Sequence, residues 1–397
     1  MLVALPIAAG LAATLTLSDR TEMRLRDPGD APTGPSIDVA TMPEARLTLA
    51  SPRTSFTLAY TPRLTLWDVN DIGVQPLWLD AGSARIESRF SDTALSLAQD
   101  ASYGSMSFAD LTFAPGPEGA PPHVDVVPTS KIIEFESTST TLGSRTETRR
   151  WEVVSRVGYQ LSGGADDASR LIIPLQKGPL ADAMAAFAAS PVDHFATTLT
   201  GSETAFSSGP EIILGEEDEG WKHRFSPVTE TNATLGVSEA RVRASPFTES
   251  SAPTYPVAEV VLEQSMLTAE DRVTVRIGSR IGPVINRLLG IVDERVQGTL
   301  VSKWTHGPFA ASAFASAQQS VPTGGPNATE LVAGELGLSY AVTEAVAFDL
   351  GVRGLWQKVS QPVVSTAAQG VTDVVEASVV QGIVFVGVTL RAPTMRL

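Results

Sequence analysis

Apolar and polar side chains alternate at every second position along many segments of this chain. From Phe56 to Leu66 the even positions are apolar, whereas the odd positions carry Thr, Ala or Arg. Successive side chains of a β-strand point to opposite faces of a sheet, so this pattern predicts strands with one apolar and one polar face. The alternation recurs in residues 13–24, 151–159, 258–263, 272–281 and 346–353. Only Gly178–Ser190 also has alanines at helical spacing, and its length equally fits a strand.

Short and long connections alternate between these segments. Turn-forming residues occupy 51–54, 91–93, 190–193, 226–229, 268–271 and 342–345, and longer stretches rich in Gly, Pro and Asp occupy 28–40, 68–82, 110–128, 244–256, 321–327 and 360–373. Short periplasmic turns and longer extracellular loops are typical of bacterial outer-membrane barrels, and the segments number about eighteen. We therefore expect residues 12–397 to form one all-β domain, a closed antiparallel transmembrane β-barrel in contact with outer-membrane lipid.

The first apolar segment of the chain, residues 2–17, does not predict a membrane-spanning helix. It is shorter than the roughly 18–20 residues that a span requires, and Pro6 interrupts it. Residues 1–11 fit either the remnant of a signal peptide or the apolar start of the first strand. Both alternatives remain open at this point.

Composition excludes several classes of function. The 29 Lys and Arg against 44 Asp and Glu give a net charge of 29 − 44 = −15, and no basic run is present, so nucleic-acid binding is not expected. The absence of Cys excludes disulfide scaffolds and thiol nucleophiles.

Two short segments are candidates for chemistry. Asp193-His194 is the candidate pair for a hydrolase, and Glu216–Glu219 offers oxygen ligands for calcium. A solvated turn and a solvated acidic run are the alternatives, and we expect no enzyme, metal or cofactor.

The polar faces contain charged side chains that a barrel would direct into its lumen, because Lys and Arg are costly at the bilayer midplane. The candidate lumen-lining residues are Arg24, Arg63, Arg156, Glu259, Glu263, Arg272, Arg276, Arg280, Asp349 and Arg353. Such charges control which solutes pass a constriction, or alternatively pair across strands and only stabilise the wall. Arg272, Arg276 and Arg280 on one strand form the leading candidate for an anion-attracting stripe, and residues 110–128 are a candidate constriction.

Tryptophans near the predicted strand ends suggest two interfacial girdles. Trp67 and Trp356 are expected at the outer interface, and Trp151, Trp221 and Trp304 at the inner one. The alternative is that these are buried Trp residues of a soluble β-sandwich.

Two segments carry a family resemblance. Phe56–Asp68 and Leu97–Gly104 resemble sequences of outer-membrane β-barrels of the myxobacterial type. The resemblance implies a porin-like barrel that is the outer-membrane pore of exopolysaccharide export and works beside a periplasmic export protein. We therefore expect a pore for a hydrophilic solute or a secreted polysaccharide, with a lumen of mixed charge. The alternative is a structural or adhesion barrel that anchors envelope machinery and has a plugged lumen.

Overall fold

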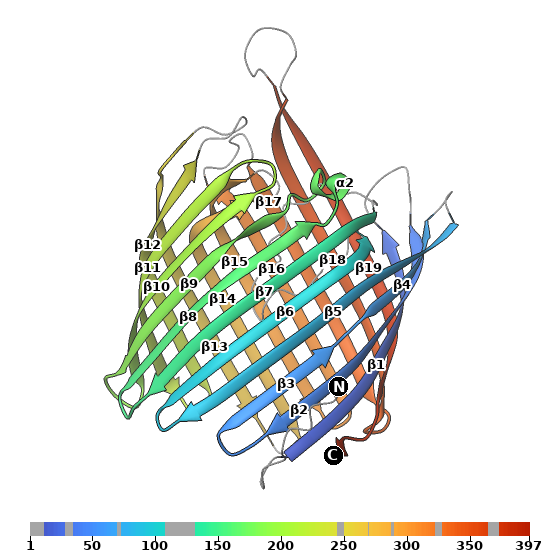
Figure 1. Ribbon diagram of the computed structural model, residues 1–397, viewed down its shortest axis with the longest axis horizontal. Helices are drawn as coiled ribbons and strands as arrows, with labels where there is room; N and C mark the ends of the chain where they lie inside the picture. The colour runs from blue at the N-terminus through green and yellow to red at the C-terminus, as the bar shows by residue number, and fades with distance from the viewer. Residues whose placement is uncertain are drawn as a thin grey trace, which may run out of the picture.

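The computed structural model shows one closed, antiparallel β-barrel (Figure 1). It describes residues 12–27, 35–69, 73–107, 132–243, 250–268, 270–286, 290–321, 328–363 and 373–397. The predicted signal remnant at 1–11 and the predicted constriction at 110–128 both lie outside the described residues. The wall of the barrel consists of 18 strands, which confirms the predicted fold class and the expected number of strands.

The strands follow one another around the wall in chain order. The first half of the wall contains β1 (Ala12–Asp27), β2 (Ser36–Ala50), β3 (Thr54–Tyr60), β4 (Arg63–Val69), β5 (Gly73–Phe90), β6 (Thr93–Ser107), β7 (Ile132–Glu147), β8 (Trp151–Gly164), β9 (Gln176–Ala188) and β10 (Asp193–Phe206). The second half contains β11 (Glu211–Ser226), β12 (Thr229–Arg243), β13 (Thr254–Leu267), β14 (Asp271–Asn286), β15 (Ile291–His306), β16 (Phe309–Val321), β17 (Thr329–Ala341), β18 (Val346–Val363), β19 (Asp373–Arg391) and the two-residue β20 (Met395–Arg396).

Two features explain why twenty labelled strands form a wall of eighteen strands. β3 and β4 are two parts of one strand of the wall, because both pair with β2 on one side and with β5 on the other. β20 only adds two residue pairs beside β1. The barrel closes where β1 pairs with β19, from Ser18 opposite Arg391 to Asp27 opposite Gly382.

The structure decides two local predictions and adds one helix that was not predicted. Gly178–Ser190 is mainly strand, within β9, so its alanine spacing does not form a helix. The long loop predicted at 68–82 is wrong, because β4 continues to Val69 and β5 begins at Gly73. The four-residue helix α2 (Asp167–Arg170) was not anticipated; Asp166 caps it, and the hydrogen bonds from Ser169 lower the pKa of the Asp166 carboxyl.

The two ends of the barrel differ in their connections. The turn end carries the tight turns between β2 and β3, between β5 and β6, and between the other strand pairs that the sequence marks. Leu397 also lies there, with its N donating to Ala13 O at 3.0 Å. The loop end carries α2 and the longest connections (Figure 1).

Contacts between strands that are not neighbours identify the inner face of the wall. Arg26 of β1 donates from Nη1 to Ser107 Oγ of β6 at 3.3 Å, and Arg280 of β14 donates from Nη2 to Glu216 Oε1 of β11 at 2.9 Å. Such contacts can form only on the concave side of a barrel. The residue pairing carries this assignment from strand to strand around the whole wall.

The outer face is a continuous set of exposed apolar side chains. On β19 they include Val384 and Val386, and on β14 Ile277, all between 47% and 52% exposed. Because large exposed apolar surfaces mark contact with another apolar phase, this face fits lipid all the way round the barrel.

The buried apolar residues that the structure describes form small clusters inside the loop end and no single core. One cluster contains Met106, Ile133 and Ile173, and a second contains Phe206, Ile212 and Val242. Hydrogen bonding around a closed ring of strands therefore holds the wall together, and these clusters close the interior at one end.

Candidate functional site: the barrel interior

All ten residues predicted to line the lumen share the inner face. Their side chains follow the same register as Arg26 and Arg280, so the alternation in the sequence assigns their face consistently. The structure does not bring them together at one site. They lie on six different strands, β1, β4, β8, β13, β14 and β18, and at different heights along the barrel axis.

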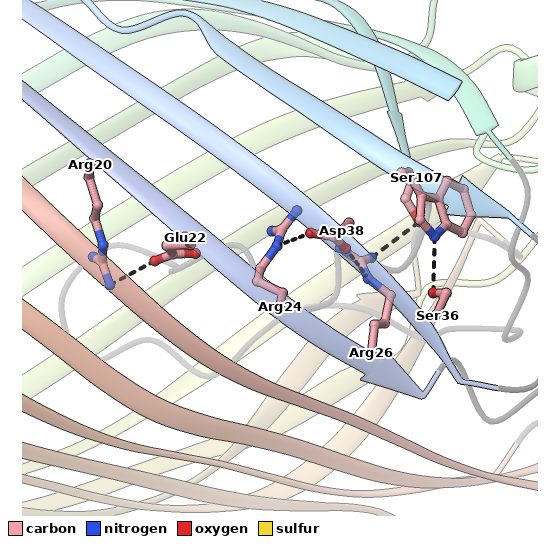
Figure 2. A network of polar contacts seen from close by, with 8 residues as sticks. Arg20, Glu22, Arg24, Arg26, Ser36, Asp38 and Ser107 are labelled. Carbon is pink, nitrogen blue, oxygen red and sulfur yellow. Dashed lines mark hydrogen bonds and ion pairs between the residues drawn. The ribbon is translucent and has the colours of Figure 1, made fainter. Parts of the chain in front are cut away.

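The most deeply buried charges form a network on β1 and β2 near the loop end (Figure 2). Arg24 donates from Nε to Asp38 Oδ1, and Arg26 donates from Nε to Asp38 Oδ2 at 3.1 Å and pairs with the same oxygen through Nη2 at 3.0 Å. The three side chains are 0–2% exposed. Two arginines thus share one carboxylate inside the barrel, where an uncompensated charge would be costly.

The tryptophan Trp67 belongs to this network. Its Nε1 donates to Ser36 Oγ at 3.1 Å, and the guanidinium of Arg26 lies 5.9 Å from its ring centroid. Trp67 is 2% exposed and shares the face of Arg63, so its predicted place in the outer interfacial girdle is wrong. The physical reason is strand alternation, because Leu64 and Leu66 take the lipid-facing positions and Trp67 points inward.

A second group of charges lines the same wall beside the β1–β19 closure. Arg20 pairs with Glu22 at 2.8 Å, and Arg353 pairs with Glu335 at 3.2 Å. The guanidinium groups of Arg20 and Arg353 lie 5.6 and 4.9 Å from the ring centroid of Phe385. The aromatic ring therefore separates two cations while attracting both through its π face.

Charges also meet on the opposite wall. Arg280 binds both oxygens of Glu216, at 2.9 and 3.0 Å, across the two strands that separate them. Asp218 lies on the same face, opposite Gly236 on β12. A Cβ at Gly236 would collide with the Asp218 carboxylate, so the sequence needs glycine there to admit the inward-pointing charge.

Inner side chains in the loop-side half of the barrel are buried around the whole circumference. Many of them are polar, and they include Arg24, Arg26, Asp38, Thr65, Thr204, Ser238, Asn286, Arg295, Gln297, Ser316, Gln318, Ser320, Thr329, Gln357 and Gln381, all at most 8% exposed. Water does not reach this part of the inner wall. The interior of the loop-side half is therefore filled with protein.

Inner side chains in the turn-side half are accessible. Arg156 has a side chain that is 57% exposed although Asp182 binds its Nε at 2.6 Å, and Arg145 is 55% exposed beside Glu152. Arg272 and Arg276 on β14 are likewise exposed on the inner face. The inner wall between these residues consists largely of Ser, Thr, Gly and Ala. The interior thus forms a wet vestibule that opens at the turn end.

The other four predicted interfacial tryptophans face outward. Trp151, Trp221 and Trp304 lie near the turn end, and Trp356 lies near the loop end opposite the exposed Val332. Among them, Trp221 and Trp304 have matching surroundings that the sequence did not reveal.

Two strand pairs repeat the same cluster of Asp, Trp and His on the outer face. Trp221 Nε1 donates to Asp193 at 3.2 Å, and His223 Nδ1 lies 2.8 Å from the same carboxylate oxygen. Trp304, His306 and Asp271 repeat this arrangement at 3.0 and 3.0 Å. Each tryptophan therefore has a polar partner at its N–H and an apolar body, as side chains at a membrane interface require.

In both candidate chemical sites, the Asp193-His194 pair and the acidic run 216–219, the structure places neighbouring side chains on opposite faces of the wall. Asp193 points outward to His223 while His194, its neighbour on the strand, points inward, so they form no dyad. The acidic run is divided in the same way, with Glu216 and Asp218 inside and Glu217 and Glu219 outside. Within the described ranges, no group of three side chains could hold a metal ion.

Sequence reasoning missed several functional side chains of the interior. Arg26, Asp38, Lys222, Arg224 and Lys303 all lie on the inner face. For Arg26 the signal was present, because it follows Arg24 at the next position of the same face on β1, whereas the other four lie on strands for which no lumen residue was predicted. Extending the alternation to every strand would have found them.

Closure, an apolar exterior and a polar interior define a bacterial outer-membrane β-barrel. In the part of the chain that is described, no helix has the length and apolar character needed to cross a bilayer. The chain belongs to the EpsX exopolysaccharide export family, whose sequence model matches residues 8–384.

Several solved structures are similar to this chain at low sequence identity. The FrpB iron transporter of Neisseria meningitidis is 9% identical, with 95% of this chain and 81% of that one covered and a TM-score of 0.50. OpdL of Pseudomonas aeruginosa is 11% identical, with 98% and 100% covered and a TM-score of 0.48. A BenF-like porin of Pseudomonas fluorescens is 9% identical, with 96% and 99% covered and a TM-score of 0.48. A search of curated protein sequences found no match.

Proposed function

We propose that this barrel is the outer-membrane pore through which an exopolysaccharide leaves the periplasm. The observation that carries the proposal is the wet inner wall of the turn-side half, which has Ser, Thr, Gly and charged side chains and faces the periplasm in an outer-membrane barrel. Barrels of 16–18 strands are wide enough to leave an aqueous channel. Membership of an exopolysaccharide export family supports a polymer as the cargo.

The proposed route has two parts with different properties. A polymer enters the vestibule from the periplasm, where a periplasmic export protein would deliver it. It then meets the filled loop-side half, whose buried charges are held by Asp38, Glu216 and Asp293. Passage therefore requires this half to rearrange, and the proposed pore opens only when it does.

Export is expected to fail in cells that lack this protein. Deletion of the gene should remove the exopolysaccharide from the cell surface, and the wild-type gene in trans should restore it. The measurement is the amount of polymer on the surface and in the periplasm. Unchanged surface polymer in the deletion strain would contradict the proposed function.

The filled loop-side half also favours a second function, a structural or adhesion barrel with a plugged lumen. Planar-bilayer recordings on the purified protein separate the two. A pore that opens should show discrete conductance steps under voltage, whereas a permanently plugged barrel should give a tight seal at all voltages.

A further inference from the structure

The inner wall of the vestibule carries an excess of positive charge on one side. Four cations lie there, on β11 and β14, and we call them the cationic arc: Lys222, Arg224, Arg272 and Arg276. Pairing places them on one face, with Lys222 opposite Asn232 and Arg276 opposite Val301. All four are exposed to the interior.

Carboxylates balance only part of this charge. On the inner face of β11–β15, from the turn end up to Gly278, the described residues include two, Glu230 and Glu263. Glu230 binds Lys222 at 2.7 Å and lies 4.0 Å from Arg224. Glu263 is opposite Arg276 in register, but no atom of the pair comes within ion-pair distance. Four cations against two carboxylates leave an excess of 4 − 2 = 2 positive charges.

The facing wall of the vestibule is different, because four of its cations have carboxylate partners, although Arg85 on β5 has none within ion-pair distance among the described residues. Arg46 binds Glu44 at 2.9 Å and Arg89 binds Glu87 at 3.1 Å. Arg145 and Arg156 have their partners at 2.8 and 2.6 Å. The excess on the arc is therefore a local property of one wall, and it occurs in a chain whose net charge is −15.

This placement gives the arc a selective role. A cleft lined by one sign of charge between low-dielectric walls raises the local concentration of oppositely charged solutes. Guanidinium groups also bind carboxylates through two parallel hydrogen bonds, which neutral sugars cannot match. From these features we propose that the vestibule takes an acidic polysaccharide, one with repeating carboxylate groups, and that the cationic arc holds it at the pore entrance. The proposal rests on the proposed function and adds the substrate class.

The test is direct binding of defined oligosaccharides to the detergent-solubilised barrel by titration calorimetry. The probes are oligogalacturonate, which is acidic, and a maltooligosaccharide of equal length, which is neutral. The variant is Arg272→Gln with Arg276→Gln. The matched control is Arg241→Gln with Arg243→Gln, which changes the net charge equally but alters outward-facing arginines at the loop end. On a denaturing gel, each protein should migrate faster without boiling than after boiling, which shows that it was folded.

The wild type and the control should bind oligogalacturonate alike, and the arc variant should bind it about 10- to 30-fold more weakly, because each arginine contributes one water-screened charge pair. Added salt should weaken the wild-type binding. Equal binding of both sugars, or full binding by the arc variant, would overturn the acidic substrate class. A barrel that binds oligogalacturonate through the arc but is dispensable for export supports the arc and overturns only the proposed function. A barrel required to export a neutral polymer overturns only the substrate class.

Discussion

Asp38→Ala is expected to lower the free energy of unfolding of the barrel by about 3–5 kcal/mol, since removal of one partner leaves buried charge uncompensated. Asp38 is 1% exposed and binds both Arg24 and Arg26 (Figure 2). The measurement is urea unfolding of the barrel in detergent micelles, followed by tryptophan fluorescence and by the fraction that still migrates as folded protein without boiling.

Glu44→Ala is the matched control for this change. Glu44 also pairs with an inner arginine, Arg46, at 2.9 Å, but their side chains are 32% and 53% exposed. Exposed ion pairs typically contribute 0–1 kcal/mol, so we expect a loss below about 1 kcal/mol. Equal losses for Asp38→Ala and Glu44→Ala would show that the network on β1 and β2 is not a buried ion cluster.

Leu142→Arg should be the most damaging single change on the outer face. Leu142 lies midway along β7, between Leu97 and Val157 in register, and all three are exposed apolar side chains. An arginine at the bilayer midplane costs about 2–4 kcal/mol in a transmembrane barrel. We expect a corresponding loss of stability in lipid vesicles and less folded protein in the outer membrane.

The neighbouring residue provides the comparison. Thr141 points inward and is opposite Ala98 and Gly158, which leave room for a longer side chain. Thr141→Arg should cost less than about 1 kcal/mol, because its guanidinium reaches water in the vestibule. If Thr141→Arg were as damaging as Leu142→Arg, the assignment of inner and outer faces on β7 would be wrong.

Much of the fold could be predicted because a barrel is specified locally. Strand alternation between Phe56 and Leu66 identifies the two faces, and turns such as 190–193 identify the strand ends. These signals lie within a few residues of one another, so neither depends on distant contacts. Segment 68–82 was misassigned because Pro76 and Gly73 read as loop, although Pro76 occupies a position in β5.

The interior could be predicted only in part. The alternation of side chains along each strand assigns Arg24 and Arg280 to the inner face, but it does not show which charges meet across the interior of the barrel. Arg26 reaches Ser107, which is 81 positions away in the sequence, and Arg280 reaches Glu216, 64 positions away. Which half of the lumen is filled depends on such distant contacts, so the wet vestibule and the filled half required the structure.

Single cysteines test the central claim most directly, namely a lipid-facing exterior around an interior that is wet at the turn end and filled at the loop end. The chain contains no Cys, so each introduced thiol is the only one present. Thr274→Cys places it on the inner wall of the vestibule, Ile277→Cys on the outer face of the same strand and Gln297→Cys in the buried loop-side half. In proteoliposomes with the turn end accessible, a charged, membrane-impermeant maleimide should label the Thr274→Cys protein rapidly and the other two slowly, and a lipid-soluble maleimide should label Ile277→Cys. Rapid labelling of Ile277→Cys by the charged reagent, or protection of Thr274→Cys from it, would contradict the account.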